Sequence, residues 1–172
     1  MTVVVRPAAL ADLDEVRRIY NQGIADRCTL DAREKSSTDI GSWFEAHDER
    51  FGVLVAEHNA GLCGWASLNR YSPREAHAGV ADLSIYVARL ARRQGVGASL
   101  MAAAERHAMR VGFDKIVLMT FPHNREGRSP FVRCGFREIG IYRNQGRLAG
   151  QLVDIIAMEK LLRSAGSCAE TR

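Results

Sequence analysis

Apolar side chains recur along the chain in two periods, one typical of helices and the other of strands. The first helical stripe, at spacings of three and four, comprises Leu13, Val16, Tyr20 and Ile24. A second amphipathic helix is predicted from Thr38 to about Asp48, with Ser37 as its N-cap. A third runs from about Val96 to Val111, and a short fourth lies near Glu126 to Cys134. The pattern therefore predicts four helices.

Strands are predicted between these helices, at 3–6, 51–57, 62–70, 80–88, 115–121, 136–144 and 151–161. The second and third form a hairpin around the turn His58 to Gly61. The last two form an antiparallel pair around the turn Gln145 to Gly150. The segment Lys115 to Phe121 is continuously apolar, which is typical of a strand that is buried on both faces.

The order of these elements predicts the fold class. A strand, a glycine-rich turn, a helix and another strand follow one another between residues 80 and 121. A right-handed crossover makes two such strands parallel neighbours. We therefore expect a mixed α/β (α+β) domain built around one twisted sheet. The domain should span residues 1–162, and the small polar residues 163–172 should form a frayed, flexible tail.

Composition and charge narrow the classes of protein. Hydrophobic residues make up 47% of the 172 residues, and no apolar run approaches the ~20 residues of a membrane helix. The first ten residues lack the pattern of a signal peptide, so we expect a cytoplasmic protein with no membrane partner. The net charge is +4, but the basic residues form no stripe with aromatic residues. No nucleic-acid partner is therefore expected.

The cysteines give no sign of a metal site or a disulfide. Cys28, Cys63, Cys134 and Cys168 are widely separated, without a C-x-x-C pair or a histidine at ligand spacing. Cys63 and Cys134 are interpreted as small core residues, and no metal is expected.

The strongest chemical signal is the segment Arg92 to Ser99. It joins a strand to the first turn of a helix, where unpaired N–H groups and the positive end of the dipole favour an anion. Gly95 and Gly97 allow a phosphate to approach closely or the backbone to adopt unusual angles. A tight turn at a helix start is the alternative interpretation, because two glycines match no dinucleotide or nucleotide loop. A group of three arginines adds positive charge: Arg89, Arg92 and Arg93.

The spacing R-x-x-G-x-G from Arg92 to Gly97 resembles the coenzyme A motif of the GCN5-related N-acetyltransferase (GNAT) superfamily. The resemblance implies the GNAT fold, a mostly antiparallel sheet with a central, splayed parallel strand pair, and acetyl-CoA as co-substrate. In that family the amides of the motif hold the pyrophosphate, and the preceding strand, here Ser84 to Val87, pairs with the pantetheine arm. The implied cofactor-binding residues are Ile85, Tyr86, Val87, Arg92, Arg93, Gln94, Gly95, Val96, Gly97, Ala98, Ser99 and Asn124.

Further motifs resemble one branch of this superfamily. Asn124 followed by Cys134-Gly135-Phe136 is similar to the N-x-x-[SA] … GF element of the family. Ile19-Tyr20-Asn21 and the pattern from Gly146 to Asp154 are similar to phosphinothricin, methionine sulfoximine and arsinothricin N-acetyltransferases. Cys28, the loop Tyr71 to His77 and Thr120-Phe121-Pro122 look closer to the arsinothricin type. The branch implies a small amino-acid-like amine, most simply a glutamate analogue, a role in toxin resistance, and a homodimer.

Acetyl transfer to an α-amine requires a base, because the amine is mostly protonated at neutral pH. Asp82 is the candidate, since it lies two residues before Ser84 on the strand expected to carry the thioester, on the same face. A structural hydrogen-bond acceptor is the alternative role. The branch usually has Glu here, and the shorter Asp favours proton transfer through a water. The resemblance implies the N–H of Val87 as oxyanion donor. Phe131 replaces the tyrosine acid of many superfamily members.

Arginines mark the predicted acceptor site. A glutamate analogue of this kind carries two anionic or strongly polar groups, which the planar guanidinium fork binds well. Taken singly, each of these residues could equally be a solvated surface residue. The substrate-binding candidates are Arg70 and Arg74 beside the catalytic strand, Arg27 after the first helix, Tyr71 as a wall or donor, and His77.

Two other functions stay open at this point. One is acetylation of a protein N-terminus or a polyamine, although the acceptor loops are rich in arginine rather than acidic. The other is a non-catalytic coenzyme A-binding sensor, which the departures at Asp82 and Phe131 allow. Replacing Asp82 by Ala distinguishes an enzyme from a sensor. An enzyme would lose turnover and keep its affinity for the cofactor, whereas a sensor would keep its function and its affinity.

Overall fold

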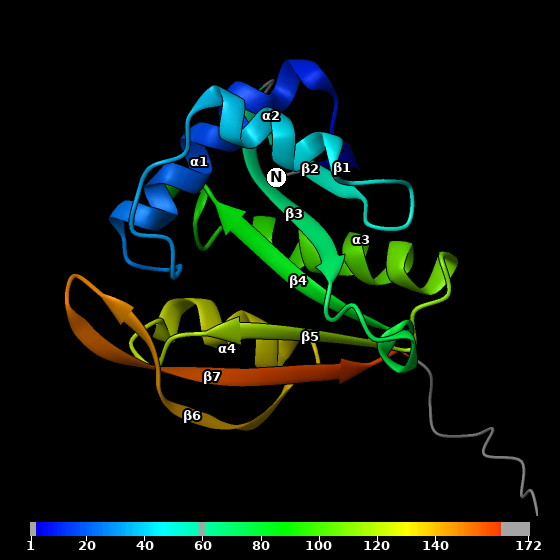
Figure 1. The fold of residues 1–172 in the computed structure, drawn as a ribbon. Coiled ribbons are helices and arrows are strands. Elements are labelled where there is room, and N and C mark those ends of the chain that lie inside the picture. Colours follow the sequence, from blue (N-terminus) through cyan, green and yellow to red (C-terminus); the bar gives the residue numbers. More distant parts are fainter. Residues whose placement is uncertain (1–2, 59–60, 163–172) are drawn as a thin grey trace, which may run out of the picture.

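A computed structural model describes residues 3–58 and 61–162. The strands in these ranges form one seven-stranded mixed sheet. The strand order is β1-β2-β3-β4-β5-β7-β6, and β4–β5 is the one parallel pair among the described strands (Figure 1). The expected mixed, mostly antiparallel sheet with a central parallel pair is confirmed. The strands are β1 Val4–Pro7, β2 Val53–His58, β3 Gly61–Arg70, β4 Val80–Val87, β5 Lys115–Thr120, β6 Arg137–Leu148 and β7 Gln151–Leu161.

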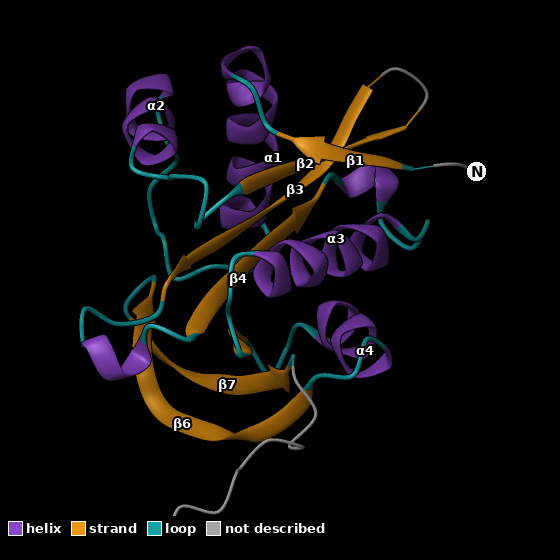
Figure 2. Ribbon diagram, turned by 90° about the vertical axis from the view of Figure 1, so that its right-hand side faces the viewer, coloured by secondary structure: helices purple, strands orange, loops and turns teal. Residues whose placement is uncertain are grey.

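Helices cover both faces of the sheet (Figure 2). On one face, α1 (Leu13–Ala25) and α2 (Ser37–Glu45) pack their apolar side chains against Trp65 of β3. On the other face lie α3 (Val96–Arg110) and α4 (Arg125–Arg133), and α3 contributes its apolar side to the main core. The sheet therefore separates two hydrophobic layers, each built around the helices on its own side.

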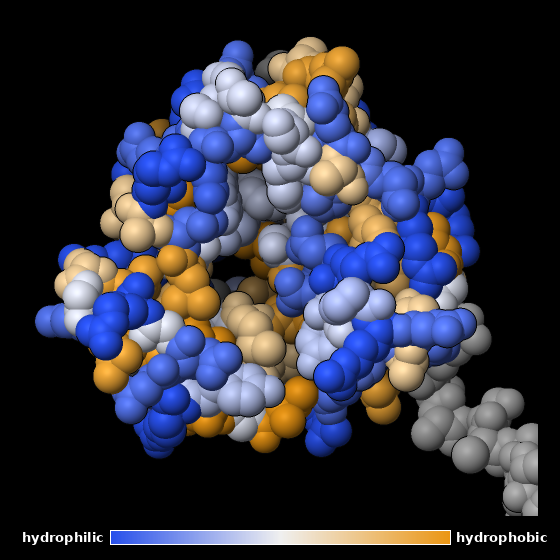
Figure 3. All heavy atoms as spheres, viewed as in Figure 1, coloured by the Kyte–Doolittle hydropathy of each residue, from blue (hydrophilic) through white to orange (hydrophobic). Residues whose placement is uncertain are grey.

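The parallel strands β4 and β5 are paired over only part of their length. Residues 80–82 of β4 pair with residues 115–117 of β5, and beyond these three pairs the strands separate (Figure 1). The space-filling view has a deep hollow where the two ribbons diverge (Figure 3). The predicted splay is therefore present, and it leaves one edge of residues 83–87 without a strand beside it.

The bounds of α2 differ from the sequence prediction. Its N-cap is Ser36 rather than Ser37, because the Ser36 Oγ accepts the N–H of Asp39 at 3.1 Å and the Asp39 carboxylate accepts the N–H of Ser36 at 2.8 Å. This reciprocal capping box fixes the start of the helix. The helix ends at Glu45 instead of near Asp48, whose carboxylate accepts two N–H groups of the following turn, each at 2.9 Å.

The turn between β6 and β7 is shorter than predicted. β6 continues through residue 148, and Gly146, expected in the turn, pairs with Val153. A Cβ at Gly146 would lie 2.5 Å from Cδ2 of Leu30, so any other residue here would push aside the tip of that half-exposed side chain. The turn itself consists of Ala149 and Gly150, which both have positive φ angles, 47° and 82°.

The remaining expectations concern cysteines, membranes and the chain end. Cys63 is buried and Cys134 packs partly buried against the core, as predicted. In the part of the chain that the structure describes, no helix is both long and apolar enough to cross a bilayer. Residues 59–60 of the predicted hairpin turn and the predicted tail 163–172 lie outside the described residues.

Candidate active site

The turn before α3 presents unpaired backbone donors. Gly95 is the N-cap of α3 and has a φ of 85°, a left-handed conformation that favours glycine. The first bond of the helix runs from the N–H of Ser99 to the carbonyl of Gly95 at 3.0 Å. The N–H groups of Val96, Gly97 and Ala98 therefore have no partner within the helix. A Cβ built at Gly95 meets no atom within 4 Å, so the space beside this glycine is open.

The free edge of β4 presents a second set of backbone donors. The N–H of Ala88 donates to the carbonyl of Cys63 at 2.9 Å, which continues the antiparallel pairing of β4 with β3. Backbone groups alternate between the two edges of a strand. The N–H groups of Ile85 and Val87 therefore point away from β3 and into the gap between β4 and β5.

Asp82 lies on the face of β4 that carries α1 and α2. It is directly opposite Asn69 of β3, and its side chain projects on the same side as those of Ser84 and Tyr86. Burial raises the pKa of Asp82 to about 6. Among the described residues the carboxylate has no hydrogen-bond or ion-pair partner. A desolvated carboxylate of this kind, poised near neutral pH, suits a general base.

A hydrogen-bonded chain of side chains borders Asp82. The Asn69 amide donates to the Oγ of Ser84 and to the backbone carbonyl of Asp82, both at 3.1 Å. The Oδ1 of Asn69 lies 3.1 Å from Nε2 of His47, whose Nδ1 contacts the carbonyl of Trp43 at 2.8 Å. Asn69 was not predicted from the sequence. Its signal was the pair of polar residues Ser67 and Asn69 on the face of β3 that also carries Trp65.

Aromatic rings form the wall of this face next to Asp82. Tyr86 stacks on Trp65 with ring centroids 4.8 Å apart, and Tyr20 meets Tyr86 edge-on at 4.8 Å. Burial raises the pKa of Tyr86 to about 12, so its phenol stays protonated at neutral pH. The Tyr20 hydroxyl donates to Asp31. The side chain of Tyr86 is thus held in the aromatic cluster, while its neighbours Ile85 and Val87 supply backbone donors to the gap.

Of the five predicted substrate residues, the structure brings three together, places Tyr71 beside them and leaves Arg27 apart. Arg70, Arg74 and His77 line a hollow of about 250 Å³, and the ring of Tyr71 lies edge-on to that of His77 at 5.3 Å. Arg27 is exposed at the end of α1, where its carbonyl accepts a hydrogen bond from His123 Nε2 at 3.1 Å.

Arg70 projects from the sheet face opposite to Asp82. It follows Asn69, which shares the Asp82 face, and its guanidinium carbon lies 5.6 Å from the centre of the Phe51 ring. Phe51 packs on the α3 side of the sheet, against Phe113. In this structure the hollow with Arg70 and the Asp82 face are therefore separated by the sheet.

Asn124 and Phe131 occupy the beginning and the middle of α4. The carbonyl of Asn124 accepts the N–H of Arg128 at 3.1 Å, and its side-chain amide donates to Oγ1 of Thr120 at 3.3 Å. Asn124 thus links the end of β5 to α4. Phe131 is buried in the core, edge-on to Phe136 at 6.0 Å between ring centres, so it contributes no proton donor.

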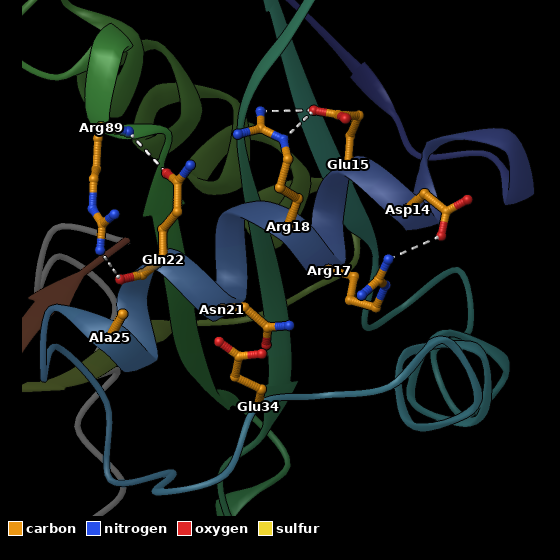
Figure 4. A pocket seen from close by; sticks show the side chains of 9 residues that line it. All are labelled: Asp14, Glu15, Arg17, Arg18, Asn21, Gln22, Ala25, Glu34 and Arg89. Atoms are coloured by element: carbon orange, nitrogen blue, oxygen red, sulfur yellow. Dashed lines mark hydrogen bonds and ion pairs between the residues drawn. The ribbon is translucent and has the colours of Figure 1, made fainter.

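A larger hollow, of about 570 Å³, lies on the outer side of α1 (Figure 4). Its charged side chains pair with one another, as in Glu15 with Arg18 at 2.7 Å and Asp14 with Arg17 at 3.6 Å. Neither Asp82 nor the free edge of β4 lines it. The hollow is therefore a surface feature of the helix and separate from the candidate active site.

The splayed strands, the donors before α3 and the carboxylate of Asp82 form a candidate site whose donors and open edge suit a coenzyme A thioester. Open space beside Gly95 and the free edge of β4 give room for an extended phosphate-bearing ligand, so the residues present fit acetyl-CoA. The chain belongs to the acetyltransferase (GNAT) family, which it matches over residues 14–136. It is an N-acetyltransferase, with acetyl-CoA as acetyl donor.

Several known acetyltransferases are similar to this protein over nearly the whole chain. YwnH of Bacillus subtilis (strain 168), provisionally named a phosphinothricin acetyltransferase, is 32% identical over 155 residues, 89% of this chain and 95% of that protein. The L-methionine sulfoximine/L-methionine sulfone acetyltransferase of Pseudomonas paraeruginosa is 27% identical over 164 residues, covering 92% and 94%. A phosphinothricin acetyltransferase from Sinorhizobium meliloti, solved with acetyl-CoA, shares the fold with a TM-score of 0.88 at 21% identity, covering 99% and 98%.

Proposed function

We propose that this acetyltransferase transfers the acetyl group to the α-amine of a small amino-acid-like substrate, most simply a tetrahedral glutamate analogue such as phosphinothricin, methionine sulfoximine or arsinothricin. The observation that carries the proposal is the partly buried carboxylate of Asp82 beside the open edge of β4, with no partner among the described residues. The similarity to acetyltransferases named for phosphinothricin and methionine sulfoximine supports this substrate class.

In the proposed reaction, Asp82 accepts a proton from the ammonium group of the substrate, directly or through a water. The amine nitrogen then forms a bond to the acetyl carbon, the carbon–sulfur bond breaks, and the thiolate takes up a proton. A pKa of about 6 keeps Asp82 ionised at neutral pH and still basic enough to accept this proton. Since Phe131 has no proton to give, the thiolate leaves unassisted or takes its proton from water.

The proposed oxyanion donor is the backbone N–H of Val87. It points into the gap between β4 and β5, where the thioester would lie if the pantetheine arm runs beside the free edge. A fixed donor aimed at developing negative charge typically contributes ~10²–10³ in rate. The amides of residues 95–98 would hold the pyrophosphate, with Arg93 adding charge and Asn124 closing the site at the end of β5.

For the substrate, we propose that Arg27, which follows α1 on the Asp82 side of the sheet, recognises an anionic group. The hollow that Arg70, Arg74 and His77 share lies across the sheet from Asp82, so it gives no support to the substrate contacts predicted for these residues and for Tyr71 beside His77. We further propose a homodimer that forms through the outer strands, because β6 is an edge strand with apolar side chains that are about half exposed. These are Ile139 at 55%, Ile141 at 45% and Tyr142 at 48%.

The experiment that tests this function measures thiol release from acetyl-CoA with a panel of amines. The panel holds phosphinothricin, methionine sulfoximine, arsinothricin, glutamate, a polyamine and a peptide with a free N-terminus. We expect the highest kcat/KM with one of the tetrahedral glutamate analogues. A higher kcat/KM with the polyamine or the peptide would contradict the substrate class, and binding of acetyl-CoA without turnover of any amine would contradict the enzyme.

A further inference from the structure

Asp26, at the C-terminal end of α1, binds two of the three arginines next to the phosphate turn. Its carboxylate accepts hydrogen bonds from Arg89 at 2.7 and 3.0 Å and from Nη2 of Arg92 at 2.6 Å. Arg89 also receives support from Gln22 of α1, whose side-chain oxygen accepts the backbone N–H of Arg89 at 3.0 Å (Figure 4). α1 is thereby fastened to the segment between β4 and α3.

Arg92 makes a second contact, and that contact reaches the proposed oxyanion donor. Its Nε donates to the backbone carbonyl of Val87 at 3.2 Å, while its Nη2 is held by Asp26. The carbonyl and the N–H of one strand residue point to the same edge, so Arg92 binds Val87 from the side of the gap. One guanidinium therefore joins the end of α1 to the last residue of β4.

The neighbouring Arg93 is arranged differently. Its side chain is exposed, its φ is 63°, and within the described ranges it forms no hydrogen bond or ion pair. The carboxylate of Asp26 orients both Arg89 and Arg92 and offsets one of their two charges, whereas no described carboxylate pairs with Arg93. Of the three cations, Arg93 is thus the one whose side chain is free to turn toward a phosphate group.

We propose that Arg92 is a positioning residue, held by Asp26, that orients the backbone of Val87 for catalysis, and that phosphate binding belongs to Arg93 and the amides before α3. The proposal rests on the proposed function, because it assigns a role within the same acetyl-CoA site. The two adjacent arginines of the R-R-Q-G-V-G segment, Arg92 and Arg93, thus have different roles. Moving Arg92 onto a phosphate would leave the Val87 carbonyl without its side-chain donor and Asp26 with one cation.

The test compares two acetyl donors, acetyl-CoA and S-acetylpantetheine, which has the same thioester arm but lacks the phosphates at the far end that a phosphate-binding residue would contact. Arg92→Met should lower kcat with acetyl-CoA and kcat/KM with S-acetylpantetheine by similar factors, at least about tenfold, because small misplacements of a catalytic donor have large effects on rate. The Kd for CoA, measured by calorimetry, should stay within about threefold of wild type. The matched variant Arg93→Met should raise the Kd for CoA by a larger factor than Arg92→Met does.

Asp26→Asn provides an independent variant, because it keeps the shape of the side chain and removes the charge. It should reproduce the Arg92→Met pattern in a weaker form, and the double variant Asp26→Asn/Arg92→Met should be no slower than Arg92→Met alone, as expected for two residues that act as one unit. An Arg92→Met enzyme with a raised Kd for CoA and normal turnover of S-acetylpantetheine would overturn the proposal. A wild-type protein that turns over neither donor would overturn the proposed function itself.

Discussion

Among the carboxylates of the described residues, Asp82 differs from those in ion pairs. The Arg6 guanidinium lowers the pKa of Asp12, Arg89 lowers that of Asp26, and Lys115 lowers that of Glu159. Burial acts in the opposite direction on Asp82 and raises its pKa to about 6. Buried carboxylates usually have cationic partners. A site without one is complementary to a cation that arrives with the substrate, as an ammonium group does.

Replacing this carboxylate by the amide of the same shape isolates its role as a base. Asp82→Asn should lower kcat by ~10²-fold or more while the Kd for CoA stays near that of wild type. In the wild-type enzyme, kcat/KM should fall about tenfold per pH unit below about pH 6, as Asp82 becomes protonated. Thiol release as a function of pH measures both effects. Turnover of Asp82→Asn at the wild-type rate would exclude Asp82 as the base.

The same substitution should stabilise the fold. Because the pKa of Asp82 is raised in the folded protein, the folded state holds this proton more tightly than the unfolded chain. Ionisation of Asp82 therefore lowers stability as the pH rises from about 4 to about 6. Above about pH 6, the free energy of unfolding of Asp82→Asn should be about 2 kcal/mol larger than that of the wild-type protein. At pH 4 the two free energies should be equal. Urea unfolding at pH 4 and pH 7.5 measures this, and an equal effect at both values would contradict the assignment.

At the scale of elements, α1 is held unusually close to β4. A Cβ at Gly23 of α1 would lie 2.7 Å from two ring carbons of Tyr86, whereas a Cβ at Gly41 of α2 would meet nothing within 4 Å. Gly23→Ala should therefore destabilise the protein by about 1–3 kcal/mol. The control Gly41→Ala should stabilise it by about 0.5–1 kcal/mol, as alanine does inside a helix. Thermal unfolding of both variants tests this contact, and equal effects would contradict it.

The free edge of β4 makes a second prediction at this scale. The N–H groups of Ile85 and Val87 face the gap, and those of Ser84 and Tyr86 face β3. Binding of CoA should slow hydrogen exchange at Ile85 and Val87 and have much less effect at Ser84 and Tyr86. Residue-resolved exchange measured by NMR distinguishes the two pairs. Equal protection of all four would mean that the ligand does not pair with this edge.

At the scale of the whole molecule, the features that depend on residues close together in the sequence could be predicted. The hairpin of β2 and β3, the glycine turn before α3 and the parallel strands around it follow from local periodicity and from the handedness of one crossover. Asp82 and Ser84 share a face because strands alternate strictly. These features therefore appear in the structure close to where they were expected.

The parts that could not be predicted depend on residues far apart in sequence. The position of Arg70 on the face opposite to Asp82 follows from the register of β3 against β4, which pairs Asn69 with Asp82. The ion pair of Asp26 with Arg92 joins residues 66 positions apart. Gly146 was assigned to a turn because its contact with Leu30, 116 residues earlier, leaves no local signal. Periodicity carries no information on such contacts.

The separation of β4 from β5 has a consequence for the behaviour of the protein in solution. A strand with an unpaired edge in the middle of a sheet is a template for any extended peptide, including one from another molecule. Concentrated samples without CoA should therefore self-associate more readily than samples saturated with it, since the bound ligand occupies that edge. Light scattering at matched concentrations measures the difference. Purification and storage with CoA would then protect the protein from aggregation by covering the open edge of β4.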